Sequence, residues 1–279
     1  MRYVLIAVLT SLVLASCSDN DEPATEIHSR VAEITDVKSV CRKILYDESG
    51  RVTEYAVSFP GETIRSTYSY TSDDFIRIHT EHRIHGFLPD GEDAVREYDD
   101  EMHLENGRVS SCEGIFSTNQ FAGGNPFQKK YRQEFTYTAE NRLTAVRNTE
   151  WNRKADSWAY DRPWTWENRY IWKNGNLTAV EDYAGNEAPT YIYRYSYTSI
   201  SGVRNIVPVH MDRYQYFPLQ LNGYFGAEPE NLISGTEYIR PDAPDSNATY
   251  QYSVDGNRVT GYTETHRGTT YDYIITWTE

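Results

Sequence analysis

Residues 191–197 read YIYRYSY, so that every second side chain is a tyrosine. The tyrosines fall on one face of this segment, and isoleucine, arginine and serine fall on the other. An alternation of period two in aromatic and β-branched residues is typical of a β-strand with one buried face. Residues 55–59, 166–172 and 271–277 repeat the alternation. We therefore expect an all-β chain built from antiparallel strands.

Turn-forming dipeptides separate the alternating segments. Asn106-Gly107 and Asn174-Gly175 predict tight two-residue hairpin turns, because both residue types accept a positive φ. After several turns the same phrase recurs, in which a polar residue is followed by an apolar residue and then by Thr or Ser. The apolar residues of this phrase are Val52, Val109, Leu143, Leu177 and Val259. We expect each of them to reach the core directly after its turn.

The hairpin phrase resembles the tyrosine-aspartate (YD/RHS-type) repeats, which also build arrays of β-hairpins. The spacing is irregular here, since Val109 and Leu143 are 34 residues apart whereas Val52 and Val109 are 57 apart. A solenoid or propeller keeps a more constant period. The irregular hairpins favour a single antiparallel meander that forms a barrel-like or strongly bent sheet.

The N-terminal residues predict export and lipid attachment. Arg2 precedes a mostly apolar run, Tyr3 to Leu14, which has the length of a signal-peptide core and is too short to span a bilayer as a helix. The run ends in Leu14-Ala15-Ser16-Cys17, which resembles the lipobox of bacterial lipoproteins. This resemblance implies cleavage before Cys17 and lipidation of its thiol. An ordinary secretory signal with a chance cysteine is the alternative.

The acidic run that follows, residues 18–22, resembles the surface-export signal of Bacteroidota lipoproteins; the alternative is a solvated linker. We therefore predict a lipoprotein signal peptide over residues 1–16, an acidic flexible tether over 17–36 and a single β domain over 37–279. The anchor at Cys17 would hold this domain at the outer membrane, facing the cell exterior.

The order of elements from Tyr170 onward is more distinctive. It includes YIWKNGNL at 170–177, GYFG at 223–226 and an Asp255-Gly256 turn. This order resembles an uncharacterised family of Bacteroidota lipoproteins with a porin-like fold, which implies a β-barrel-like sheet and implies no activity. Strands of this kind also suit a membrane-spanning barrel. We expect a soluble barrel with aromatic residues inside and charges outside, because the chain carries a lipid anchor motif and does not end in an aromatic residue.

The composition excludes several classes of partner. The chain has 27 Lys and Arg against 41 Asp and Glu, a formal net charge of -14. Nucleic-acid binding requires a basic surface, and so does docking on anionic lipid through a protein face. We therefore expect no nucleic-acid partner, and membrane contact through the lipid at Cys17. Aromatic residues make up 14% of the chain, which is sufficient for a core that contains few leucines.

Two cysteines, Cys41 and Cys112, remain once Cys17 is lipidated. An exported protein meets an oxidising or external environment, where these two could form a disulfide. Cysteines in a β-rich chain are also often small buried residues that stay unpaired. The sequence leaves both interpretations open.

A run of tryptophans is the strongest candidate for a ligand site. The residues of interest are Trp151, Trp158, Tyr160, Asp161, Trp164 and Trp166. Exposed aromatic rings could stack on sugar rings while charged neighbours bond the hydroxyl groups, which predicts a glycan-binding loop. The alternative is a long hairpin loop that tucks its tryptophans over the barrel mouth.

Residues 204–236 keep no clean period and contain three prolines, so we expect a long crossover with at most a short helix or 3₁₀ turn. Its aromatic residues include Tyr214, Tyr216, Phe217 and Tyr224. They could line a groove, but we favour the interpretation in which the crossover covers an edge of the sheet.

No stretch carries the spacing of a catalytic motif. His79, His82 and His85 form the densest group of histidines, and on a strand they do not converge on one metal ion. The abundant carboxylates include no pair with a distinctive spacing. We therefore expect no catalytic residue, no metal and no cofactor, and we predict a surface-anchored binding or interaction module for a glycan or a surface protein. A structural or adhesion protein without a small-molecule site and a glycoside hydrolase-like enzyme are the alternatives.

Overall fold

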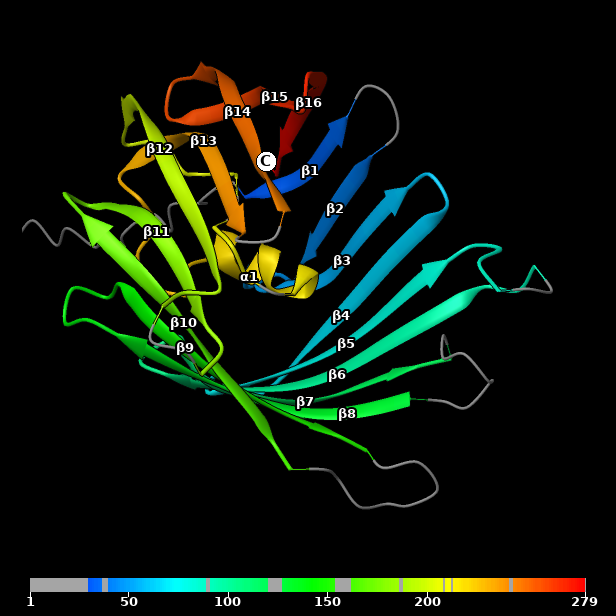
Figure 1. The fold of residues 1–279 in the computed structure, drawn as a ribbon. Coiled ribbons are helices and arrows are strands. Elements are labelled where there is room, and N and C mark those ends of the chain that lie inside the picture. The colour runs from blue at the N-terminus through cyan, green and yellow to red at the C-terminus, as the bar shows by residue number, and fades with distance from the viewer. Residues whose placement is uncertain are drawn as a thin grey trace, which may run out of the picture.

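The computed structural model describes residues 30–36, 40–88, 91–119, 127–153, 162–185, 188–207, 209–211, 213–240 and 243–278. Sixteen antiparallel strands form a closed barrel, in which each strand pairs with the next along the chain and the first pairs with the last (Figure 1). The strands are β1 (Val31–Asp36), β2 (Cys41–Tyr46), β3 (Val52–Phe59), β4 (Glu62–Ser72), β5 (Phe75–Ile84), β6 (Ala94–Glu105), β7 (Arg108–Thr118), β8 (Phe127–Tyr137), β9 (Leu143–Asn152), β10 (Trp164–Lys173), β11 (Asn176–Tyr183), β12 (Tyr191–Ser201), β13 (Asn231–Arg240), β14 (Ala243–Asp255), β15 (Arg258–His266) and β16 (Thr269–Trp277). The predicted all-β antiparallel barrel is confirmed.

The predicted boundary between the tether and the β domain is wrong, because β1 lies in the range assigned to the tether. This strand pairs with β2 on one side and with β16 on the other, and so closes the barrel. Its Ile34 and Asp36 side chains are buried. The strand escaped prediction because it is short and its sequence, VAEITD, carries only weak alternation. The predicted signal peptide and Cys17 lie outside the described residues.

Aromatic residues and the recurring phrase hold one end of the barrel together. All five apolar residues of the phrase are buried, as predicted. An aromatic residue near the end of an even-numbered strand donates a hydrogen bond to a carbonyl oxygen near the start of the preceding strand. These bonds are Tyr46 Oη to Val31, Tyr137 Oη to Val109, Trp172 Nε1 to Leu143, Tyr197 Oη to Leu177, Tyr252 Oη to Ile233 and Trp277 Nε1 to Val259. We call this arrangement the aromatic clasp.

The polar residue of the phrase often adds a cation–π contact to the clasp. The guanidinium of Arg108 lies 4.9 Å from the ring centre of Tyr137, and that of Arg142 lies 5.6 Å from the ring of Trp172. The phrase therefore has a structural cause: its arginine covers the clasp ring from the solvent side while the following apolar residue enters the core.

The two ends of the barrel differ. The short-turn end carries two-residue turns such as Asn106-Gly107 and Asn174-Gly175, whose residues all have positive φ as predicted. The opposite end, the loop end, carries longer connections such as 85–93, 119–126 and 153–163. The Arg30 backbone N–H donates to Thr278 Oγ1 at 2.9 Å, so the described chain begins and finishes at the short-turn end.

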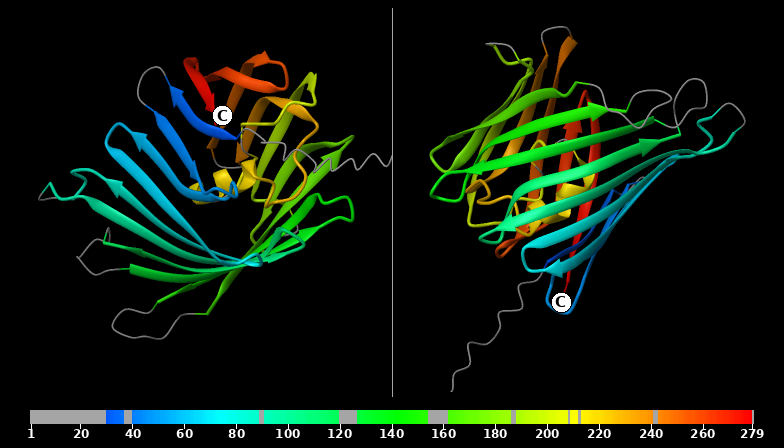
Figure 2. Two further views of the ribbon diagram at one scale, coloured as in Figure 1. Left: turned by 180° about the vertical axis from the view of Figure 1, so that it is seen from behind. Right: turned by 90° about the horizontal axis from the view of Figure 1, so that it is seen from below.

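The crossover between β12 and β13 enters the barrel from the short-turn end. It contains η1 (Tyr214–Tyr216) and α1 (Phe217–Leu221), which lie inside the ring of strands (Figures 1 and 2). Backbone bonds tie it to the wall, from Val109 N to the carbonyl of Tyr224 and from Ala227 N to the carbonyl of Asn141. The prediction of a crossover with a short helix is confirmed. The prediction that it covers a sheet edge is wrong, because a closed barrel has no edge and the crossover fills the interior instead.

The outer wall is charged. Ion pairs join neighbouring strands on this surface, among them Arg65–Glu54 at 2.7 Å and Arg77–Glu101 at 3.1 Å. Arg132 and Glu134 pair on β8 at 3.0 Å, each with 47% of its side chain exposed. Within the described part of the chain, no helix is both long and apolar enough to cross a membrane.

The two cysteines do not form a disulfide, because both are free and lie on opposite faces of the wall. Cys112 is buried in the lumen, where the Tyr216 hydroxyl lies 3.3 Å from its Sγ. Cys41 lies on β2 with its thiol 3.6 Å from Glu33 Oε1. The alternative interpretation, two unpaired thiols, describes the structure.

Candidate functional site: a cavity in the barrel mouth

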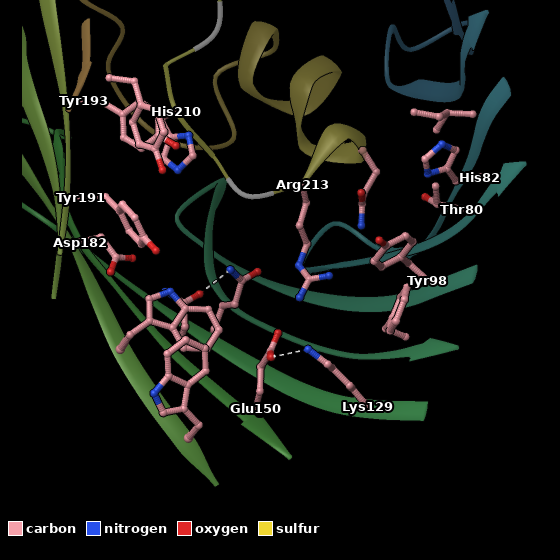
Figure 3. Close-up of a pocket in the computed structure, with 18 residues that line it drawn as sticks. Thr80, His82, Tyr98, Lys129, Glu150, Asp182, Tyr191, Tyr193, His210 and Arg213 are labelled. Atoms are coloured by element: carbon pink, nitrogen blue, oxygen red, sulfur yellow. Dashed lines mark hydrogen bonds and ion pairs between the residues drawn. The ribbon is translucent and has the colours of Figure 1, made fainter. Parts of the chain in front are cut away.

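A cavity of about 530 Å³ lies in the lumen toward the loop end, which is within the usual size of ligand pockets. We call it the mouth cavity (Figure 3). The strands alternate, so each sends every second side chain into the lumen, and residues distant in sequence meet there. The lining comprises Ile64, Thr80, His82, Tyr98, Phe116, Lys129, Gln133, Asn148, Glu150, Trp164, Trp166, Asp182, Tyr191, Tyr193, His210, Arg213, Gln215 and Tyr238.

Stacked aromatic rings form part of the cavity wall. Trp164 and Trp166 stack with ring centres 4.6 Å apart, and Trp164 remains 55% exposed. Further along the same stretch of wall, on β12 and β13, Tyr193 stacks on His210 at 3.7 Å and on Tyr238 at 4.4 Å. Aromatic rings combine a large apolar surface with limited conformational freedom, which suits them to hold a flat apolar face of a ligand.

A chain of hydrogen-bonded side chains crosses four strands beneath these rings. Gln133 Nε2 donates to Asn148 Oδ1 at 2.7 Å, Asn148 Nδ2 to Asn168 Oδ1 at 2.7 Å, and Asn168 Nδ2 to Asp182 Oδ2 at 3.1 Å. At its inner end, the Tyr216 hydroxyl donates to Gln133 Oε1 at 2.6 Å. We call this the amide ladder. Because each side chain is fixed by its neighbours, its remaining donors and acceptors are held in place before any ligand arrives.

The charged side chains of the cavity are mostly paired. Lys129 Nζ lies 3.1 Å from Glu150 Oε2, and His82 Nε2 lies 2.9 Å from Glu62 Oε2. Among the described residues, no group of three or more His, Cys, Asp or Glu could hold a metal ion. His79 and His85, which the sequence analysis singled out, pair instead with Asp99 and Asp93.

A buried acidic residue lies behind the cavity. Asp100 Oδ1 accepts a bond from the Tyr131 hydroxyl, and Asp100 Oδ2 accepts one from Gln215 Nε2 at 2.8 Å. Burial raises the pKa of Asp100, and the nearby Arg213 guanidinium opposes that shift. Burial also raises the pKa of Tyr131. Since both groups are enclosed, they stabilise the floor of the cavity and do not reach a ligand.

A second cavity, of about 520 Å³, lies beside the first. Its lining is mainly aromatic and aliphatic and includes Tyr55, Phe217 and Tyr250, with Arg42 as a charged member. The crossover separates the two cavities, because its His210 and Arg213 line both.

The structure brings two of the predicted tryptophan-site residues into the mouth cavity. Trp164 and Trp166 line the mouth cavity. Trp151 pairs in register with Lys130 on the outer side of the wall and lines neither cavity. The predicted site residues Trp158, Tyr160 and Asp161 lie outside the described residues, as does the side chain of Tyr214.

Most of the lining residues were not predicted from the sequence. Tyr193 belongs to the alternating segment 191–197, whose inward face was a usable signal. The residues of the amide ladder gave no such signal in the sequence, because polar residues at inward positions interrupt the hydrophobic pattern. Arg213 lies in the irregular crossover, where no periodicity applies.

The solved structures that resemble this chain include two porin-like proteins. The one from Bacteroides vulgatus aligns with a TM-score of 0.54 and 13% identity, covering 88% of this chain and 98% of its own. The one from Bacteroides uniformis aligns with a TM-score of 0.49 and 15% identity, covering 89% and 96%. No family model matches the chain, and no curated protein does. At 13% identity the first likeness shows the fold alone, and it confirms the porin-like fold that the sequence resemblance implied.

Proposed function

We propose that this protein is a surface lipoprotein whose mouth cavity binds a glycan. The observation that carries the proposal is the meeting of stacked aromatic rings and the amide ladder in one cavity. A sugar ring presents flat C–H faces and a rim of hydroxyl groups. The aromatic rings would take the faces, and the side chains at the two ends of the ladder, Gln133 and Asp182, would bond the hydroxyls.

The outer wall supports a barrel that stands in water. A lipid-facing barrel carries an apolar band about 25 Å tall, and an arginine or lysine at the bilayer midplane costs about 2–4 kcal/mol. Here β5, β6 and β8 carry Arg77, Glu101, Arg132 and Glu134 on their outer faces, paired with one another across or along the strands. Membrane attachment would therefore come from lipid on Cys17.

The positions of the chain ends support an orientation. Arg30 lies at the short-turn end, which the crossover fills. A tether from Cys17 would join the barrel at this end, and the mouth cavity would then face away from the membrane. An outward mouth suits the capture of a ligand from outside the cell.

Detergent phase partition tests the anchor and the wall together. The full-length protein purified from membranes should enter the detergent phase, and Cys17→Ser should stay in the aqueous phase as a folded monodisperse barrel. Mass spectrometry should find lipid on the N-terminal cysteine. A Cys17→Ser protein that requires detergent to remain folded would contradict a water-facing wall.

A glycan array tests the ligand class. We expect the lipid-free Cys17→Ser protein to bind a restricted set of glycans, and Trp166→Ala to lose that binding. Trp151→Ala is the matched control, because Trp151 lies on the adjacent strand but outside both cavities. A folded protein that binds no glycan, or equal losses in both variants, would overturn the proposal.

A further inference from the structure

Arg213 is a largely enclosed cation in the mouth cavity, and within the described part of the chain no carboxylate contacts its guanidinium. Its guanidinium lies 3.5 Å from the ring centre of Tyr131 and 5.6 Å from that of Tyr98. Its Nε is buried without a hydrogen-bond partner. Among the residues that the structure describes, no acidic oxygen lies within 4.0 Å of its guanidinium nitrogens. An enclosed charge without a hydrogen-bonded partner is costly, so this position is poised to receive an anion.

Asp100, a nearby buried acid, attracts Arg213 electrostatically but makes no ion pair with its guanidinium. Both oxygens of Asp100 accept hydrogen bonds from neutral donors, the Tyr131 hydroxyl and the Gln215 amide. Asp100 is buried and does not line the cavity, while Arg213 extends from the crossover into the cavity (Figure 3).

The other charges of the cavity are already bound. Lys129 and Glu150 pair with each other, and Asp182 accepts the last bond of the amide ladder. A ligand that carries one negative charge would thus meet an unpaired guanidinium without having to break an existing ion pair.

We propose that the glycan bound in the mouth cavity is acidic, and that the Nη groups of Arg213 receive its carboxylate or sulfate. This inference rests on the proposed glycan function and adds the chemical class of the ligand. The planar guanidinium offers paired N–H donors that match the oxygens of either anion. The stacked rings on β10, β12 and β13 would hold the sugar that bears the charge.

The test compares matched sugars on the lipid-free protein. Uronic-acid and sulfated oligosaccharides are set beside their neutral parents of equal length, and free glucuronate and glucose serve as competitors. We expect the acidic members to bind at least tenfold more tightly than the neutral parents, and glucuronate to compete where glucose does not. Arg213→Gln should remove the difference while leaving neutral binding in place.

Arg42→Gln is the matched control, because Arg42 also lies over an aromatic ring in the lumen, 5.7 Å from that of Phe217, but lines the second cavity only. It should keep the preference for acidic sugars. Equal affinity for acidic and neutral sugars in the unaltered protein would overturn the inference and leave glycan binding standing, even if Arg213→Gln fails to fold. Absence of binding to any sugar would overturn the proposed function itself.

Discussion

The hydroxyl of Tyr137 at the end of β8 donates a 2.8 Å hydrogen bond to the carbonyl oxygen of Val109 at the start of β7. Six strand pairs, including this one, share the same relationship, and together they form the aromatic clasp of the short-turn end. It links two features of the sequence that lie up to 29 residues apart in a pair, the closing aromatic residue and the opening apolar residue. The clasp therefore fixes the register of each pair at the end where the crossover enters.

Removal of one clasp bond should cost stability. Tyr137→Phe leaves the Val109 carbonyl without its partner, and we expect a loss of about 0.5–1.5 kcal/mol in the free energy of unfolding. For a domain of this size each kcal/mol corresponds to about 2–4 °C in Tm. Tyr183→Phe is the control, since its hydroxyl bonds Glu181 on the outer wall. A Tm of Tyr137→Phe equal to that of the parent would argue against the clasp.

The docking of the crossover on the wall makes Gly226 sensitive to substitution. Gly226 has φ of 88°, and an added Cβ would lie 2.3 Å from the carbonyl oxygen of Asn141. Gly107 has φ of 74° with open space around it. Chemical denaturation should show Gly107→Ala to cost about 1–2 kcal/mol and Gly226→Ala about 2–5 kcal/mol, because strain and overlap add. Equal costs would indicate that the crossover does not press on Asn141.

The crossover also carries a partly buried acid, Glu228, that should make stability depend on pH. Burial raises the pKa of Glu228 from 4.5 to about 7, although Arg204 lies 3.9 Å away and opposes the shift. The folded state thus disfavours the ionised form. The contribution of Glu228 to the free energy of unfolding should be most favourable below about pH 4.5. It should fall as the pH rises to about 7, by roughly 3 kcal/mol at most.

Glu228→Gln should flatten the pH dependence of Tm over this window. Glu230→Gln is the control, because Glu230 is two residues away with 63% of its side chain exposed and Glu228 remains in place. A Glu228→Gln protein that loses stability with pH as steeply as the parent would contradict the assignment.

Free thiols give a test of the lumen. Burial raises the pKa of Cys112 well above its usual value, and burial followed by the charge of Glu33 raises that of Cys41. In Cys17→Ser, we expect a thiol reagent to modify Cys41 slowly and Cys112 only after denaturation. Absence of both thiols after denaturation without a reductant would indicate a disulfide and contradict the structure.

Local patterns predicted the strands and their inward faces well, and long-range pairing less well. Alternation placed Tyr193 and Tyr273 on inner faces, and the phrase placed Val52 and Val259 in the core. Closure through β1 could not be predicted, because it joins Ile34 to Ile275 across nearly the whole chain.

The candidate site was harder to predict for the same reason. The bond between Gln215 and Asp100 spans 115 residues, and nothing local indicates that the two meet. The tryptophan run pointed to the correct end of the barrel through Trp164 and Trp166. It could not separate these inward rings from Trp151, which faces outward, because the direction of each side chain depends on the register of its strand.

Calorimetric titration of the glycan that binds most tightly on the array will show whether the ligand binds inside the barrel mouth. Tyr193 stacks on His210 and Tyr238 within the mouth cavity, whereas Tyr183 lies on the outer wall beneath Arg169. We expect one site per chain, a loss of at least tenfold in affinity for Tyr193→Ala, and unchanged affinity for Tyr183→Ala. Unchanged affinity in a folded Tyr193→Ala protein, or an equal loss in Tyr183→Ala, would contradict a binding site in the mouth.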